Sequence, residues 1–440
     1  MIEPIVQEEQ AISAFQAALI SLSEEMPSEG PLAKMQAKAW EQLVSCGLPT
    51  RKTDEFRYVP LRKLYEHGYQ QTSATTIDPK QFDDAIYPEC KESVLVFVNG
   101  HYSPQLSCTT AIPKRVAISS LEEGTKTYGA FLTNHWAKMV KEETDAFAFL
   151  NAALHRDGLF IYLPPKTVVE NPVQILHLID AQDDRALLLP RMQCFVGAHS
   201  QVEFVASQVV ISGSAYCLST VIDVVIEEES HVRFSQSQCD GPGAIWNFDA
   251  IRSILKKNST FNVVTVTDGS TSIRNDYRSI LAGENAEVAL NGVWMLSGNK
   301  EAHTHVLIDH QAPLCRSRQL FKGALNDFSH SSFEGKILVR QAAQKTDAFQ
   351  LNNNLLLSER AQADSKPNLE IFADDVKASH GATFGQLDAE QMFMMRSRGI
   401  PQSEAKNLLV GGFCKEVIDL VTVSSLWNEL NDRLKRYREG

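Results

Sequence analysis

The hydrophobic pattern of the chain changes near residue 158. From there to about residue 387, short runs of branched and aromatic residues follow one another between polar or glycine breaks, and long helical patterns are nearly absent. Many short strands without crossover helices indicate a sandwich, a barrel or a β-solenoid. The clearest predicted strands cover residues 159–163, 173–176, 202–205, 221–226, 263–266, 277–281, 287–295, 303–308 and 336–339.

No exact sequence repeat is present, so a solenoid with a strict period is not expected, although a degenerate one is compatible with the pattern. The run Gln350–Leu357, with three consecutive asparagines, favours it. Asparagine tolerates left-handed turns and can stack as a ladder between turns of a solenoid. The alternative is a single polar turn between two strands.

The region before the strands has apolar residues at helical spacing near its start and a mixed pattern later. Gly47 is expected to end the second helix. A loop-like segment follows it, and residues 70–155 are mixed. The predicted elements are helices over residues 8–25, 31–46 and about 141–154, and a short strand at Val94–Val98.

Helical periodicity returns near residue 388. Asp388 with Gln391 predicts a capped helix through Arg398, and Gly399 and Pro401 indicate a break followed by another helix. The final helix has an apolar face that must pack on the β core or bind another protein, and the pattern alone favours packing. Its apolar residues are Phe413, Val417, Leu420, Leu426, Leu430 and Leu434.

Composition restricts the class of protein. The chain has 440 residues, 43% hydrophobic and 22% charged, with a formal net charge of -12. An acidic chain of ordinary composition argues against nucleic acid or an anionic membrane as the main partner. The first residues lack a basic segment followed by an apolar core, and no apolar run approaches the length of a membrane helix. We therefore expect a soluble, cytoplasmic protein.

Eight cysteines are widely separated and never form a C-x-x-C pair. This spacing disfavours a zinc knuckle or a ferredoxin-type cluster held by this chain alone. We expect most of these thiols to be free core residues.

Common enzyme signatures are missing, including the P-loop, H-E-x-x-H and G-x-S-x-G. The segment 373–388 nevertheless gathers Asp374, Asp375 and His380 beside glycines. Neutral imidazole binds borderline metals such as iron, so His380 is a candidate ligand. The alternatives are a hydrated turn with a structural histidine, or an acid/base carboxylate pair acting on a polysaccharide. Adjacent strand residues point to opposite faces, so that pair is poorly placed unless it lies in a turn.

His303 and His305 form a weaker candidate site. Residues two apart in a strand point to the same face, so these two imidazoles could share a metal. Two ligands are too few for a specific site. His330 and Cys315 are interpreted as structural.

From about His303 to Phe413 the chain resembles the core domain of the SufB/SufD family. The resemblance covers most of the chain, includes Gly47–Thr50, and is weakest between about 70 and 155. The matching pieces are Thr304–Val306, Pro313–Gln319, Phe321–Gly323, Phe333–Ile337, Ala343–Ala348, Asn354–Ser358, Asp364–Ile371, Ser379–Thr383, Gly385–Asp388 and Arg396–Gly399. Lys366–Ile371, His380–Thr383 and Gly385–Asp388 are similar to the SufD branch rather than the SufB branch.

The resemblance implies a mainly β fold, with a right-handed parallel β-helix between two helical regions. The implied domains are residues 1–155, 156–385 and 386–440. It also implies a non-catalytic scaffold in a SufBCD complex of one SufB, one SufD and two SufC subunits. The C-terminal helices would dock SufC, the ABC-type ATPase, which makes partner binding the leading role for the final helix. The β-helix would pair with SufB, and iron–sulfur clusters would be assembled at that interface.

Residue by residue, the resemblance places His380 on the functional histidine of that interface. The family often has cysteine two positions earlier, where this chain has Ala378. Alanine supplies no thiolate, so a cluster site would need His380 together with ligands from SufB. We therefore expect no stably bound cofactor and only a transient iron or iron–sulfur cluster. A SufB-type paralogue and, for the isolated chain, a homodimer remain alternatives.

Overall fold

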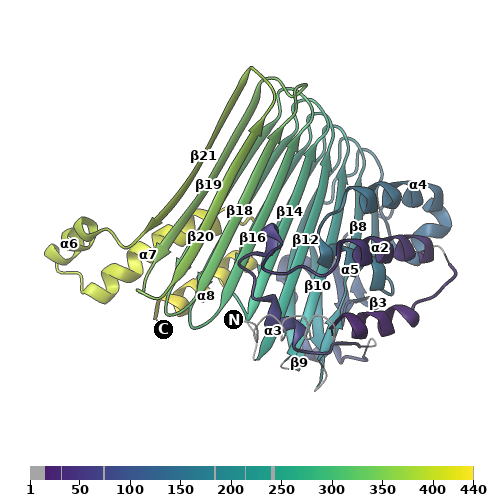
Figure 1. Ribbon diagram of the computed structural model, residues 1–440, viewed down its shortest axis with the longest axis horizontal. Coiled ribbons are helices and arrows are strands. Elements are labelled where there is room, and N and C mark those ends of the chain that lie inside the picture. Colours follow the sequence, from purple (N-terminus) through teal and green to yellow (C-terminus); the bar gives the residue numbers. More distant parts are fainter. Residues whose placement is uncertain are drawn as a thin grey trace.

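The computed structural model has a parallel β-solenoid of about eight turns at its centre, with helices before and after it in the chain (Figure 1). The mainly β prediction is confirmed. No helix in the described part of the chain is long and apolar enough to cross a membrane. The structure describes residues 15–30, 32–72, 75–182, 185–213, 215–238 and 243–439.

Two sheets form the walls of the solenoid, and from β8 onward successive strands of the chain alternate between them. One sheet, called sheet A here, contains in spatial order β5 (Leu159–Leu163), β8 (Arg191–Val196), β10 (Ala215–Ile226), β12 (Ala244–Leu255), β14 (Ser272–Leu281), β16 (Glu301–His310), β18 (His330–Val339) and β20 (Gln362–Ile371), and β7 (Ala186–Leu188) pairs with β10. Sheet B contains β6 (Val173–Asp180), β9 (Gln201–Ser212), β11 (His231–Gln238), β13 (Thr260–Thr267), β15 (Glu287–Leu296), β17 (Arg316–Leu325), β19 (Thr346–Leu356) and β21 (Val376–Gly385).

The solenoid repeats in structure but not in sequence. Paired residues in neighbouring turns lie between 26 positions apart, as for Trp246 and Ser272, and 33 apart, as for Leu159 and Met192. One corner of most turns has a non-glycine residue with positive φ, which lets the chain turn sharply. These corner residues are Lys166, His199, Glu229, Asn258, Asn285, Leu314 and Lys345. Because side chains of different kinds occupy one conformation, the period leaves no repeated motif.

Alternate residues of each strand point into the solenoid and form its main core. Val306 and Ile308 of β16 contribute to it, stacked among aromatic side chains of other turns. The asparagine run lies within β19 and not in a turn: Asn352 and Asn354 are buried, and Asn354 Nδ2 donates to Asn352 Oδ1 at 2.8 Å. Their partners on β17 are Phe321 and Gly323, so asparagines do not stack between these turns.

Helices of the N-terminal region cover part of the outer face of sheet A. Residues 15–24 are helical and α2 ends where Gly47, with φ of 72°, follows it; both fit the sequence prediction, whose first part, 8–14, lies outside the described residues. The strand at Val94–Val98 is confirmed, and the expected helix around 141–154 begins later, at Ala146. The elements are α2 (Ala33–Cys46), η1 (Asp54–Phe56), α3 (Leu61–Tyr65), β1 (Gln70–Gln71), η2 (Pro79–Gln81), η3 (Asp83–Ala85), η4 (Pro88–Cys90), β2 (Val94–Val98), β3 (His101–Cys108), β4 (Ala117–Ser120), α4 (Leu121–Glu142) and α5 (Ala146–Leu154).

This region also closes the first turn of the solenoid. β4 pairs antiparallel with β5, and β2 pairs with β6 and carries β3 on its other side. On the outer face of sheet A, Phe147 of α5 stacks on Phe248 of β12 with ring centroids 3.7 Å apart. The first strand edges are therefore paired, and the neighbouring apolar face is buried.

A buried ion network fixes the N-terminal region to sheet A. Asp276 of β14 binds Arg252 at 2.6 Å and Arg274 at 2.9 Å, and these guanidinium groups reach Glu143 at 2.8 Å and Asp145 at 2.6 Å respectively. Burial alone would raise the pKa of Asp276, but the surrounding arginines hold it well below its usual range. The carboxylates therefore stay charged and clamp the α4–α5 junction to the sheet.

The C-terminal helices are α6 (Ala389–Ser397), α7 (Gln402–Ile418) and α8 (Ser424–Glu439). The Asp388 side chain caps α6 by accepting from the N–H groups of Glu390 and Gln391, as the sequence predicted. The predicted final helix is wrong in its bounds, because it is two helices, α7 and α8, separated by a short turn. Both pack their apolar residues on the outer face of sheet B.

Candidate functional site

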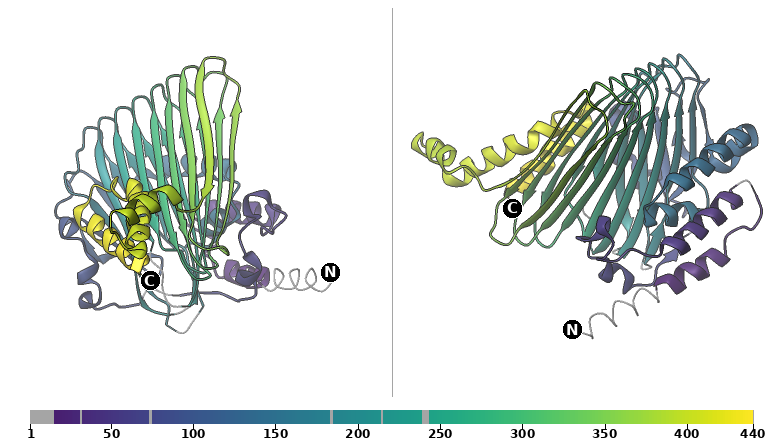
Figure 2. Two further views of the ribbon diagram at one scale, coloured as in Figure 1. Left: turned by 90° about the vertical axis from the view of Figure 1, so that its left-hand side faces the viewer. Right: turned by 45° about the horizontal axis from the view of Figure 1, so that its top comes forward.

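The last turn of the solenoid is its most exposed part. β20 and β21 are ten residues each, and in the part of the chain described neither has a further strand on its outer edge (Figure 2). An open strand edge can pair with another chain. Four large apolar side chains at or near this turn are 39–62% exposed: Phe349, Ile371, Phe372 and Phe384. This turn therefore has the properties of a contact surface.

His380 is exposed on β21, at the open end of the solenoid interior. It pairs in register with Gln350 of β19, which pairs with Gln319 of β17. Both glutamines are fully buried, and Gln350 Nε2 donates to Gln319 Oε1 at 2.9 Å. Paired residues of a parallel sheet point to the same side, so His380 continues an interior column of polar side chains to the surface.

Gly335 of β18 makes space for this column. A Cβ at this position would lie 2.0 Å from Nε2 of Gln350, so a larger residue would displace the glutamine. The Oε1 atom of Gln350 is buried and has no hydrogen-bond partner within the described ranges. A buried acceptor therefore lies in the strand next to His380, on the same side of the sheet.

Ala378 faces the same side of β21 as His380, because the two are two residues apart. It pairs with buried Ala348 and packs, half-buried, on the small apolar cluster at the end of the core. The alanine brings no ligand atom to this place. No group of three possible metal ligands that the structure describes includes His380, so the chain contributes a single imidazole here.

Asp374 and Asp375 lie in the turn between β20 and β21, and both side chains are exposed. The backbone N–H of Asp375 donates to the side-chain oxygen of Gln344 at 3.0 Å, which ties this turn to the previous one. An exposed turn offers no enclosed site for a sugar ring. The geometry gives no support to an acid/base pair.

His303 and His305 both lie on β16 and are buried, but they have different partners. His305 Nδ1 lies 2.8 Å from Asp276 Oδ2, within the ion network under the N-terminal region. His303 lies beside His330 of β18, with ring centroids 5.6 Å apart. The structure thus brings His303 together with His330, which the sequence analysis had interpreted as structural. Glu301, also near them, was not a candidate at all.

Five of the cysteines that the structure describes are buried within the fold. Cys90, Cys194, Cys217, Cys315 and Cys414 are buried, and Cys239 lies outside the described residues. Burial raises the pKa of the Cys90 thiol and of the Cys414 thiol to about 12. A neutral thiol is a poor ligand and nucleophile.

The three C-terminal helices differ in what they contact. α7 and α8 bury Val417, Leu426, Leu430 and Leu434 against sheet B, whereas Leu420 stays 45% exposed. α6 has no buried residue and extends away from the solenoid (Figures 1 and 2). Its Phe393 and Met394 are 72% and 53% exposed. Packing therefore accounts for α7 and α8 but not for α6.

The chain is similar to proteins of iron–sulfur cluster assembly. Two family models match it: the SufBD core domain of the SUF system for FeS cluster assembly over residues 177–413, and the SufBD protein N-terminal region over residues 6–175. It is 28% identical over 419 residues to the iron–sulfur cluster assembly protein SufD of Escherichia coli strain K12, covering 94% of this chain and 95% of that protein. A SufBD family protein of Synechocystis is 28% identical over 410 residues, covering 91% of this chain and 89% of that protein.

Proposed function

The chain belongs to the SufBD family of iron–sulfur cluster assembly proteins, and from this premise we propose that it is a SufD-type scaffold subunit. In this role it pairs through its last solenoid turn with a SufB-type partner and docks a SufC-type ATPase through residues 386–440. The cluster is cargo, assembled between the subunits, and is not a resident cofactor. The observation that carries the proposal is the uncovered last turn with His380 on it.

The last turn supports pairing with a partner of the same architecture. Its two strand edges have backbone N–H and C=O groups directed outward, and its exposed Phe372 and Phe384 add apolar area. A second solenoid that docks end to end or edge to edge would cover both the strand edges and these apolar side chains. In isolation a second copy of this chain could cover the same surface, which gives the homodimer as the alternative occupant.

His380 would be this chain's ligand to the transient iron or cluster. An exposed imidazole at the rim of the solenoid can reach an ion held between two subunits. Ala378 supplies no thiolate, so the remaining ligands must come from the partner. Assembly then depends on both subunits, because this chain supplies only part of the site.

The ATPase contact is assigned to α6 and the adjoining surface of α7. α6 has no buried residue, and its exposed Phe393 and Met394 are the side chains most suited to fill a partner's pocket. In this proposal the chain is a non-catalytic scaffold, and the SufC-type partner hydrolyses ATP.

Co-expression with SufB-type and SufC-type candidates tests the proposal. We expect the tagged chain to capture both partners, Phe393→Glu with Met394→Glu to lose the ATPase, and Phe384→Asp to lose the SufB-type subunit. Val44→Glu on α2 is the matched control, since Val44 is 55% exposed on a distant helix. Deleting residues 386–440 is a poorer test, because it would also uncover the apolar face of sheet B. Capture of neither partner by folded wild-type chain would refute the proposal.

A further inference from the structure

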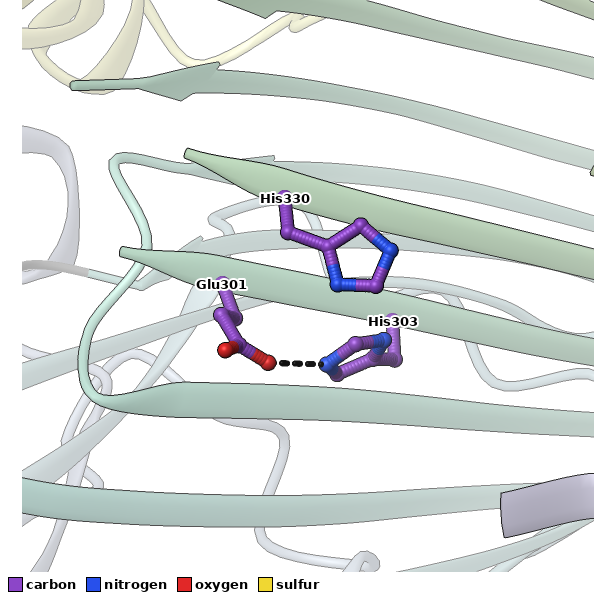
Figure 3. Close-up of side chains that lie close together, drawn as sticks. All are labelled: Glu301, His303 and His330. Atoms are coloured by element: carbon purple, nitrogen blue, oxygen red, sulfur yellow. Dashed lines mark hydrogen bonds and ion pairs between the residues drawn. The ribbon is translucent and has the colours of Figure 1, made fainter. Parts of the chain in front are cut away.

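Three side chains converge on the outer face of sheet A, away from the last turn. Glu301 and His303 lie on β16 and His330 on β18 (Figure 3). One ligand atom from each lies within 4.8 Å of the other two. Glu301 and His330 are a register pair, and His303 is two residues after Glu301, so the pleat places all three on one side. The cluster is a consequence of the solenoid register.

Each imidazole is oriented by a further polar group. His303 Nδ1 lies 2.8 Å from Ser332 Oγ, and its Nε2 lies 3.0 Å from Glu301 Oε2. His330 Nε2 lies 2.8 Å from Asp364 Oδ2, so its Nδ1 is the nitrogen left to face the Glu301 carboxylate and His303 (Figure 3). In metal-binding histidines, one ring nitrogen typically forms a hydrogen bond with a carboxylate or hydroxyl group, and the second ring nitrogen binds the ion.

The Ser332 hydroxyl allows His303 to change tautomer without changing charge. Without an ion, Nε2–H donates to the Glu301 carboxylate and the Ser332 hydroxyl donates to Nδ1. When an ion takes the Nε2 lone pair, the ring carries its proton on Nδ1, and Nδ1–H donates a hydrogen bond to the Ser332 hydroxyl oxygen. Burial lowers the pKa of His303.

The cluster is enclosed but reachable. His303 is only 2% exposed, whereas the side chains of Glu301 and His330 keep 20% and 19% of their exposure. Tyr58 of the N-terminal loop lies beside His330, with ring centroids 6.3 Å apart. An ion could enter past Glu301 and would then be shielded on its other sides.

We propose that Glu301, His303 and His330 form a binding site for a first-row divalent cation, iron(II) or zinc(II). Two imidazoles and one carboxylate with open positions suit both ions. The bound ion would connect β16 and β18, with Asp364 of β20 orienting His330, and so join three successive strands of sheet A. This site does not depend on the proposed function, since it lacks His380 and the partner-facing edge.

The test is equilibrium binding of zinc(II), and of iron(II) under anaerobic conditions, to metal-free full-length chain without any partner. We expect one equivalent for wild type and loss of that equivalent in His303→Gln and His330→Gln. Asp364→Asn should weaken binding by about 10- to 100-fold, as expected for a group that orients a ligand. The two titrations identify which ion binds more tightly.

The matched control is His199→Gln. His199 Nδ1 also lies 3.0 Å from a carboxylate, that of Glu229, but this exposed pair has no third ligand in the described chain. Glu301→Gln keeps a hydrogen-bonding group beside His303. This variant therefore separates loss of binding caused by loss of the carboxylate from loss of binding caused by misfolding. Cobalt(II) as a spectroscopic probe should show nitrogen and oxygen ligation. Equal binding by wild type and His330→Gln, thiolate charge-transfer bands, or no stoichiometric binding by wild type would each overturn the site.

Discussion

The two ends of the solenoid have the same architecture and opposite exposure. In β5, at the first turn, four of five residues are buried, whereas no residue of β20 or β21 is buried. The first turn is covered by β2, β4 and the N-terminal helices, and the last turn has no such cover in the part of the chain described. The difference teaches that the chain itself covers one end of the solenoid, whereas in the described residues it leaves the other end exposed.

The covered part should fail first when its ion network is broken. Asp276→Ala leaves three guanidinium groups without their shared carboxylate. We expect the free energy of unfolding to fall by about 3–5 kcal/mol, because a buried charge without its partner is strongly unfavourable. Urea denaturation measures this. The control is Asp347→Ala, which removes an Arg–Asp pair of equal length, 2.6 Å, with both side chains 41% exposed, and should cost less than about 1 kcal/mol.

A Phe→Ala substitution should affect the free energy of unfolding differently at the two ends of the solenoid. Phe160 of β5 is 1% exposed and Phe384 of β21 is 49% exposed. Phe160→Ala should lower the free energy of unfolding by about 3–5 kcal/mol through the cavity it leaves. Phe384→Ala should change it by no more than about 0.5 kcal/mol. Equal effects in chemical denaturation would mean that the last turn is covered in the isolated chain, as in a homodimer.

Acid should loosen the covered part in a defined pH range. Burial opposes the charge of Glu143, but Arg252 and Arg278 lower its pKa from 4.5 to about 2. A carboxyl group with a lowered folded-state pKa stabilises the fold above its unfolded pKa, and this contribution is lost as pH falls from about 4.5 to about 2. Hydrogen exchange in α4 and α5 should therefore rise over that range. Glu143→Gln should show high exchange already at neutral pH and a flatter profile.

The smallest effect on the fold is expected at the open end. His380→Ala removes an exposed side chain, so the free energy of unfolding should change by no more than about 0.5 kcal/mol. Cluster formation in the co-expressed complex should nevertheless be lost, as followed by its visible absorbance. Ser379→Ala, the exposed neighbour that points to the other side of β21, is the control and should assemble clusters normally.

The sequence was sufficient for the family, the mainly β class and most strands, because strand residues alternate in a recognisable way. It was not sufficient for the register between turns. His303 and His305 are neighbours in sequence, but His330, 29 positions after Glu301, is the neighbour in space. No repeated motif indicates that spacing, since the corners that set it use five different residue types.

The long helix α4 was also missed, for a local reason. Its buried residues include Gly124 and Thr125, which are poor helix formers, and the helix is kinked at Tyr128. Its apolar positions are therefore sparse and out of phase. Ala378 and His380 were identified as a pair from the family resemblance, and their common side of β21 follows from their spacing, but their roles stay predictions. The domain boundaries at residues 155/156 and 385/386 stay predictions too.

The corners with positive φ have a consequence for the length of the molecule. Each corner N–H donates to a carbonyl of the next turn: His199 N–H donates to Glu228 C=O, and Glu229 N–H donates to Lys257 C=O. These turns therefore share one hydrogen-bonding pattern. One more turn inserted with such a corner would separate the two ends by a further strand spacing of about 4.8 Å and alter neither of them. The number of turns therefore sets the distance between the N-terminal region and the open end of the solenoid.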